Sequence, residues 1–294
     1  MLHPPEDPCE QEQWAKEMVC PMVNAKMLLG LFLLVIAAGM YVLFGPLAAL
    51  AMIATAFVAE YADSTLGMGY GTTLAPVLLA LGYPVTEVVP ALLASELITG
   101  FLAGLAHHSE GNVNLRQGKH LRATILLSVL SVVGVLAGAN LAISLPKAAI
   151  NTYIGAMVLM LGLWVLLLRR HINELSWWRL MVVGVVASFN KAMSGGGYGP
   201  VVTGGQLASG IEAKAAVGIT SVAEGVTCVA ALAVFACNGI YPEWHLTMPL
   251  VAGAVASVPF TAITVKRAGE RRFRGILGIA MILLGTLTLW RVWG

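Results

Sequence analysis

The chain has 294 residues, of which 58% are hydrophobic and 11% are charged, and its mean hydropathy is +0.83. Soluble domains carry about 25% charged residues, so this composition excludes a globular enzyme with a single anchor and predicts an integral membrane protein with many crossings. The net charge of +2 is too small to favour a nucleic-acid partner. The four cysteines lack the spacing of a metal site, so we expect free thiols, no bound metal and no cofactor.

The first half of the chain predicts a polar tail followed by apolar helices. Residues 1–26 lack the pattern of a cleaved signal peptide, which favours a cytoplasmic tail. Residues 27–45 are apolar and long enough for one additional crossing. We expect a first transmembrane repeat over residues 46–175, with an apolar segment at 47–66, a short segment at 72–81 and spans at 88–106, 121–143 and 148–168.

The second half, residues 176–294, repeats this order. It predicts an apolar segment at 180–193, a short segment at 200–209 and spans at 215–236, 246–265 and 273–290. At a constant offset of 128 residues, Gly67 aligns with Gly195, Tyr70 with Tyr198, and Glu96 with Glu224, and no gap is needed. This alignment indicates an internal duplication.

Each repeat carries a glycine-rich break inside apolar sequence, at Gly67–Gly71 and at Ser194–Pro200. A membrane helix tolerates such a break only where protein or water satisfies the freed backbone groups. As helices, segments 180–193 and 200–209 would be about 21 Å and about 15 Å long, which is short for a hydrocarbon core of about 30 Å. We therefore expect a re-entrant hairpin at each break; the alternative is that each short segment crosses fully.

Lysine and arginine gather in loops 107–122, 169–179 and 266–274, which predicts that these loops are cytoplasmic. Counting crossings then places the two hairpin mouths on opposite faces, as in secondary transporters. The expected fold is an all-α integral membrane protein of two inverted repeats, each a Gly-tipped re-entrant or broken-helix hairpin plus three transmembrane helices, with one extra N-terminal helix. We expect a multi-pass protein of the inner (plasma) membrane with a cytoplasmic N-terminus.

The motif Ser-Gly-Gly-Gly-Tyr-Gly-Pro-Val-Val-Thr at 194–203, with Gly210 beyond it, has a first-repeat counterpart in Gly67–Gly71, Pro76 and Gly82. Over residues 47–290 these motifs resemble the TauE/SafE family of sulfite and organosulfonate exporters. The resemblance implies export of sulfite, a sulfonate such as sulfoacetate, or a related organic acid, coupled to a proton or cation gradient. Met68 departs from the family motif, which has a glycine there. A small-anion channel and an integral-membrane enzyme are the alternative classes, and the latter lacks a catalytic constellation.

The predicted anion site lies at the two breaks. A glycine turn before a short helix exposes backbone N–H groups at the positive end of the helix dipole. Alternatively, the glycines only let helices pack closely. The predicted substrate-binding residues are Gly67, Gly69, Tyr70, Gly71, Thr72, Thr73, Lys191, Ser194, Gly195, Gly196, Gly197, Tyr198, Gly199, Thr203 and Gln206. Pro200 suits the first position of its helix, and the two tyrosines are either gating groups or core aromatics.

Lys191 is the one basic residue expected deep in an apolar span. Because burying a charge in a membrane costs free energy, we expect this lysine to have a function. It could neutralise the anion, pair with its repeat partner Asp63, or extend to the interface from a helix end. Glu96 and Glu224 are matched mid-helix acids that either carry a coupling proton or bind the N–H groups of the glycine turn. We assign Asp63, Glu96 and Glu224 coupling or structural roles.

Two further features rank lower. Glu60 has a serine as its repeat partner, Ser188, and carries no assigned role. His107, His108 and His120 are expected in a cytoplasmic loop and not in a metal site.

Overall fold

The computed structural model describes residues 46–167, 176–267 and 270–293, and within these ranges all regular structure is helical. The predicted tail at 1–26 and the extra helix at 27–45 lie outside the described residues. The helices are α2 (Pro46–Leu66), α3 (Tyr70–Ala80), α4 (Val85–Ser109), α5 (Gly118–Ser144), α6 (Lys147–Leu167), α7 (Trp177–Ser194), α8 (Tyr198–Ala208), α9 (Ala213–Cys237), α10 (Trp244–Arg267) and α11 (Glu270–Trp293). Every apolar segment expected between residues 47 and 290 is a helix.

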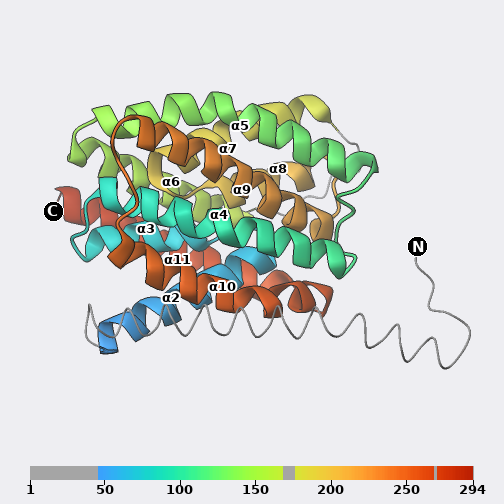
Figure 1. Ribbon diagram of the computed structural model, residues 1–294, viewed down its shortest axis with the longest axis horizontal. Helices are drawn as coiled ribbons and strands as arrows, with labels where there is room; N and C mark the ends of the chain where they lie inside the picture. The colour runs from blue at the N-terminus through green and yellow to red at the C-terminus, as the bar shows by residue number, and fades with distance from the viewer. Residues whose placement is uncertain (1–45, 168–175, 268–269, 294) are drawn as a thin grey trace, which may run out of the picture.

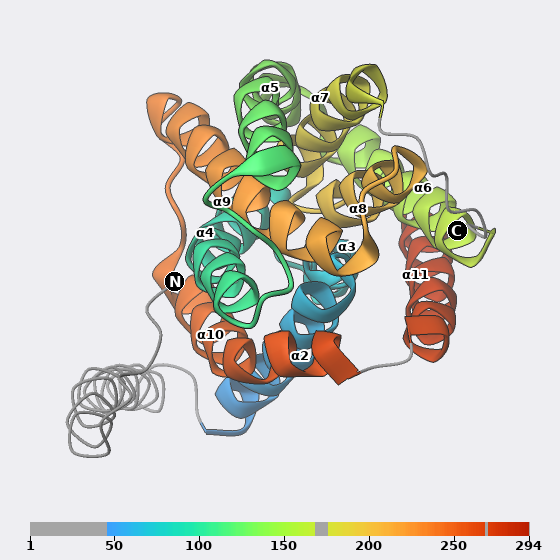
Figure 2. The same cartoon turned by 90° about the vertical axis from the view of Figure 1, so that its right-hand side faces the viewer.

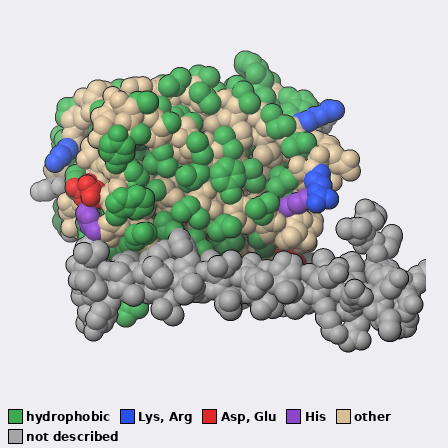
Figure 3. Space-filling model, in the orientation of Figure 1, with side chains coloured by type: hydrophobic (Ala, Val, Ile, Leu, Met, Phe, Trp, Pro, Cys, Tyr) green, Lys and Arg blue, Asp and Glu red, His purple; other side chains and the backbone are tan. Residues whose placement is uncertain are grey.

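The helices form a bundle with an apolar exterior. In the described ranges, five are long and apolar enough to cross a membrane: Val85–Ser109, Gly118–Ser144, Lys147–Trp164, Ala213–Cys237 and Trp244–Val265. Most helices lie along the long axis of the molecule (Figure 1). The face in Figure 3 is covered by hydrophobic side chains in its middle, whereas charged side chains stand at its two ends. Soluble monomers rarely expose so much contiguous apolar surface, which agrees with a membrane protein.

The structure repeats the sequence duplication. Helices α3 and α8 have the same bounds at an offset of 128 residues, and so have α4 and α9. Contacts also come in matched sets, because α2 packs on α10 as α7 packs on α5, and α4 on α10 as α9 on α5. Figure 2 looks roughly along the bundle and shows α3 and α8 near its middle, enclosed by the other helices.

The equivalent helices α6 and α11 pack antiparallel. Trp293 Nε1 donates to Thr152 Oγ1 over 3.0 Å at one end of the pair. Further along, a Cβ on Gly155 would lie 2.9 Å from the Leu289 side chain, and one on Gly285 would lie 2.6 Å from the Leu159 nitrogen. Successive residues of α6 thus contact residues of α11 with ever lower numbers, so the last helices of the two repeats run in opposite directions.

Each short helix doubles back alongside the helix before it. The backbone N–H of Ser176 donates to the carbonyl of Ser209 over 3.2 Å, which joins the start of α7 to the end of α8. In the first repeat, Ala49 at the start of α2 and Leu81 at the end of α3 line one cavity of about 410 Å³. In both repeats the short helix therefore ends close to the start of the helix that precedes it.

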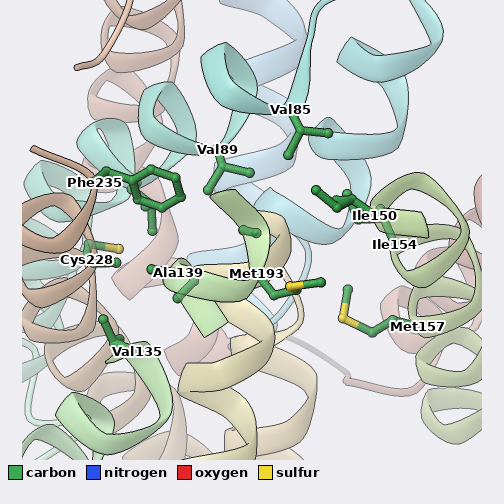
Figure 4. Packing of buried hydrophobic residues seen from close by; sticks show 14 of the residues in the cluster. Val85, Val89, Val135, Ala139, Ile150, Ile154, Met157, Met193, Cys228 and Phe235 are labelled. Atoms are coloured by element: carbon green, nitrogen blue, oxygen red, sulfur yellow. The ribbon is translucent and has the colours of Figure 1, made fainter. Parts of the chain in front are cut away.

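Buried hydrophobic residues from five helices hold the bundle together near these turns. Val89 of α4, Ala139 of α5, Ile154 of α6, Met193 of α7 and Phe235 of α9 belong to one cluster (Figure 4). Met68, the residue that departs from the family motif, is 1% exposed and packs in the same cluster. The thiols of Cys228 and Cys237 are free, as expected, whereas Cys9 and Cys20 lie outside the described residues.

A salt bridge joins the two repeats at the end of the bundle that carries loop 110–117. Lys119 Nζ lies 2.6 Å from Glu212 Oε1, and His120 Nε2 lies 3.4 Å from Glu212 Oε2. The hydrogen bond from Lys119 lowers the pKa of Glu212 from 4.5 to about 2. The Glu212 carboxylate is more than half exposed, so solvent screening keeps the contribution of the pair below about 1 kcal/mol.

Glu212→Gln tests this pair. Because the folded pKa is depressed, the stabilisation is complete above pH 4.5 and is lost as the pH falls towards 2. We expect the variant to melt slightly below the parent at pH 7, with the difference shrinking at pH 4 and below. Thermal unfolding in detergent at both pH values measures this. A difference that grows on acidification would contradict the assignment.

Candidate functional site

The two glycine breaks cross in direct backbone contact. A Cβ on Gly71 would lie 1.9 Å from the Gly195 carbonyl oxygen, and one on Gly199 would lie 2.5 Å from the Gly67 carbonyl oxygen. These two contacts are equivalent at the offset of 128 residues. A Cβ on Gly196 would likewise meet Gly71 backbone at 2.5 Å. The close-packing explanation therefore holds for Gly71, Gly196 and Gly199, whatever else the breaks bind.

Other glycines of the breaks are required by backbone conformation. Gly195 and Gly197 have φ values of 73° and 79°, and their counterparts Gly67 and Gly69 have values of 70° and 138°. Side chains with a Cβ rarely adopt this region. The two classes of glycine together turn the chain twice in a small space, and that brings the starts of α3 and α8 to the centre of the bundle.

The short helices begin earlier than the sequence indicated. They start at Tyr70 and Tyr198, so Pro200 occupies the third helical position and not the first. The proline is tolerated there because the first backbone N–H groups of a helix have no partner within the helix. Thr73 Oγ1 bonds the Gly69 carbonyl over 2.6 Å, whereas Thr72 is buried and its hydroxyl has no partner within the described residues.

Lys191 is the centre of the site. Its side chain is completely buried and its ammonium group donates to Glu96 Oε2 and, over 2.8 Å, to Glu224 Oε1. Two expectations are therefore wrong: Lys191 does not extend to an interface, and its ion-pair partners are the glutamates rather than Asp63. The glutamates in turn bind a lysine, not the N–H groups of a glycine turn. The matched acids of α4 and α9 converge because these two helices pack together.

The Asp63 side chain caps the N-terminus of the short helix α3. Its Oδ1 accepts a hydrogen bond from the backbone N–H of Tyr70 over 3.2 Å. A carboxylate at a helix N-terminus is favoured by the helix dipole. The equivalent position in the second repeat is Lys191, which cannot accept a hydrogen bond. Within the described ranges, no side-chain oxygen accepts a hydrogen bond from the backbone N–H of Tyr198, and the N-cap residue Gly197 has no side chain that could do so.

The predicted polar lining mostly holds the breaks in place. Thr203 Oγ1 donates to the Gly67 carbonyl over 2.7 Å and lies 3.1 Å from Thr220 Oγ1. Gln206 donates to the same Thr220 hydroxyl over 2.8 Å. The Ser194 hydroxyl donates a hydrogen bond to the Asn190 carbonyl over 2.7 Å and accepts one from the Gly196 N–H over 3.2 Å. The bonds of Thr203 and Gln206 tie α8 and α9 to the first break, whereas those of Ser194 stay within α7 and the second break.

The two predicted tyrosines are fully buried. The Tyr70 hydroxyl lies 2.7 Å from Ser95 Oγ. Tyr70 and Tyr198 belong to hydrophobic clusters, and each is the first residue of a short helix, directly after a glycine break. Core packing and a place at the site are thus compatible for this pair.

Sequence reasoning missed one part of the network. His107 was expected in a loop, but it lies in the last turn of α4 and is fully buried. Its Nε2 donates to the Ser64 carbonyl over 2.8 Å, and its Nδ1 accepts from Asn112 over 3.1 Å. These partners fix a neutral tautomer. The duplication gave one hint, because the residue equivalent to His107 at the offset of 128 is a phenylalanine, Phe235, which is buried. In the described part of the chain no group of three metal-ligating side chains occurs.

Comparison with known proteins identifies a family of membrane transporters. The family described as "Sulfite exporter TauE/SafE" matches residues 51–288, which include both breaks and all the buried charged residues of the centre. Over 249 residues the chain is 28% identical to the "Probable membrane transporter protein YtnM" of Bacillus subtilis (strain 168), covering 80% of this chain and 81% of that protein. No solved structure matches the chain significantly.

Proposed function

The chain belongs to the TauE/SafE sulfite exporter family of membrane transporters, and from this premise we propose that it exports a small sulfur-containing anion by alternating access, coupled to an ion gradient. The substrate class is sulfite, a sulfonate such as sulfoacetate, or a related organic acid. The family description supports the sulfur-containing anion, and the multi-pass fold supports a membrane pathway. The remaining support comes from the geometry of the centre.

The proposed topology is that of two inverted repeats with hairpins entering from opposite faces. The antiparallel packing of α6 and α11 supports the inversion. The joined ends of α7 and α8 support a re-entrant hairpin rather than two crossings. We propose that the end carrying loop 110–117 is cytoplasmic, because lysine and arginine gather in the loops at that end. In this arrangement the crossed breaks lie near the middle of the membrane, where secondary transporters bind substrate.

The observation that carries the proposal is the difference between the two repeats at this crossing. Duplication produced two short helices whose N-terminal N–H groups can bind an anion. The Asp63 carboxylate occupies that position on α3. The residue equivalent to Asp63 in the second repeat is Lys191, a buried cation. We place the substrate at the α8 N-terminus, with its oxygens accepting from Lys191 Nζ and from the N–H groups of Tyr198 and Gly199.

Binding then competes with the glutamates that hold Lys191. The ammonium group is shared between Glu96 and Glu224, and we infer that an incoming sulfonate oxygen displaces one carboxylate. A displaced carboxylate has lost its charge partner in a buried place, so a less negative centre favours the exchange. Anion binding therefore depends on the net charge of the centre. The exchange also links α4 and α9, one from each repeat, to the occupancy of the site.

A small-anion channel is the alternative class. The backbone contact between the breaks closes the centre of the bundle, which favours an alternating site over an open pore. We expect purified protein in liposomes to carry sulfite and methanesulfonate with a flux that saturates. Tracer flux measures this, and a binding screen with sulfite, sulfoacetate, taurine and carboxylate analogues ranks the substrates. Ohmic single-channel currents without saturation would contradict the transporter.

A further inference from the structure

Glu60 is a buried carboxyl group to which the proposed transport function gives no role. It lies on α2, about two turns before the first break, and is 2% exposed. Ser64 Oγ donates to its Oε1 over 2.5 Å. Its Oε2 has no hydrogen-bond partner in the described part of the chain. One oxygen of this group therefore faces the interior with nothing to neutralise it.

The neighbouring acids each have a partner that Glu60 lacks. Glu96 and Glu224 share Lys191, and Asp63 accepts the Tyr70 N–H. All four acids interact electrostatically. With every group ionised, four carboxylates and one ammonium would leave the centre with a net charge of −3. An isolated buried carboxylate costs so much free energy that it takes up a proton instead.

We propose that Glu60 is the proton-binding site of the transport cycle. This inference rests on the proposed transport function. Glu60 and Asp63 are three residues apart and share one face of α2. A proton on Glu60 makes the centre less negative and favours the substrate anion. Loss of that proton adds a negative charge beside Asp63 and expels the anion. Proton and anion therefore bind together, and acidity on one side promotes flux from that side.

The groups that face Glu60 agree with this role. From the helices around it they are Asp63 of α2, Tyr70 of α3, Glu96 of α4 and Glu224 of α9, with Lys191 of α7 acting through them. Helix α10 contacts this part of α2 through Phe260, which packs on Phe57, and through Thr264, whose Oγ1 lies 2.7 Å from the Tyr61 hydroxyl. The described side chains of α11 add no charge to this environment. No cation close to Glu60 within the described ranges is free to replace the proton, because Lys191 already serves two carboxylates.

A hydrogen-bonded chain connects Glu60 to one face of the bundle. The Ser64 hydroxyl donates a hydrogen bond to Glu60, and the Ser64 backbone carbonyl accepts one from His107. His107 in turn accepts a hydrogen bond from the side-chain amide of Asn112, which lies in the loop after α4. The neutral His107 is a positioning residue that keeps the Ser64 turn in place. Glu60 is thus nearest to the end carrying loop 110–117, which we expect to supply its proton.

The first experiment detects the proton without any substrate. Infrared spectroscopy of the purified full chain at pH 7 should show the band of a protonated carboxyl group. In Glu60→Gln that band should be lost, and in the control Glu87→Gln, an acid in the first turn of α4, it should remain. Glu60→Ser, which installs the residue found at Ser188, gives a second variant should the glutamine variant fold poorly. An unchanged band in the Glu60 variants overturns the proposal.

The second experiment tests coupling in liposomes with labelled methanesulfonate, whose own charge does not vary with pH. Acidifying the side that holds the probe should accelerate its flux in the parent and in Glu87→Gln. Glu60→Gln should keep anion exchange at equal pH but lose the acceleration. Acceleration in Glu60→Gln equal to the parent overturns the coupling role. Absence of any methanesulfonate flux in the parent overturns the transport proposal and the coupling role with it, whereas the infrared band alone decides whether Glu60 holds a proton.

Discussion

Lys191→Ala is expected to reduce sulfite and methanesulfonate binding by roughly 10- to 100-fold and to abolish their transport. A hydrogen bond to a charged group contributes about 1.5–3 kcal/mol, and Lys191 is the buried cation proposed to face the α8 N-terminus. Calorimetric titration of the purified variant and tracer flux in liposomes measure the two effects. Lys119→Ala, which removes an exposed lysine, is the matched control and should bind as the parent does.

The same substitution also leaves two buried glutamates without their cation. Removal of one partner of a buried ion pair costs about 3–5 kcal/mol, so Lys191→Ala alone confounds binding with stability. The triple variant Lys191→Met, Glu96→Gln and Glu224→Gln removes every charge of the cluster and should recover much of the lost melting temperature without recovering binding. Parent-like affinity in Lys191→Ala, or in the triple variant, would refute the assignment of Lys191 to the substrate.

Gly71→Ala is expected to prevent the two breaks from crossing. The added Cβ would lie 1.9 Å from the carbonyl oxygen of Gly195, and both sides of this contact are backbone, so no side chain can move aside. Overpacking of a well-packed interior costs about 1–3 kcal/mol and occasionally more, and we expect the upper end or a failure to fold. Fluorescence-detected size exclusion and thermal unfolding measure the outcome.

Gly225→Ala is the control for this prediction. It too replaces a buried helical glycine, but its Cβ would meet the Phe101 ring at an ordinary 3.4 Å, so its melting temperature should stay near that of the parent. Gly199→Ala, whose Cβ would meet the Gly67 carbonyl oxygen at 2.5 Å, should behave as Gly71→Ala does. A parent-like melting temperature for Gly71→Ala would show that the breaks do not touch as described.

The duplication explains why so much of the fold could be read from the chain. Apolar runs with loop charges at their ends specify helices in a membrane, and the matched Gly67 and Gly195 located both breaks. The hairpins were predicted from segment length and from the number of crossings that the loop charges require, because segments of about 15–21 Å are short for a hydrocarbon core. Helix starts were less accurate, as Tyr70 and Tyr198 show, since glycine weakens the local signal for a helix boundary.

The partners of the buried charges could not be read in the same way. The offset pairs Asp63 with Lys191, and that equivalence suggested a bond between them. Equivalent positions in a duplication are related by symmetry, however, and need not touch. Lys191 instead meets Glu96 and Glu224 because α4 and α9 cross beside it. His107 was assigned to a loop for a similar reason, since its burial depends on contact with Ser64, which lies on α2.

Taken by itself, the sequence determined that this is a membrane protein of duplicated helices, that its breaks fall at two glycine motifs and that one lysine lies among apolar residues. These features depend on composition and on spacing along the chain. Only the tertiary structure decided that the breaks touch, that Asp63 caps one short helix while Lys191, at the equivalent position, pairs with Glu96 and Glu224, and that one oxygen of Glu60 has no hydrogen-bond partner among the described residues. Those outcomes depend on contacts between helices distant in sequence, where desolvation makes each buried charge sensitive to its neighbours.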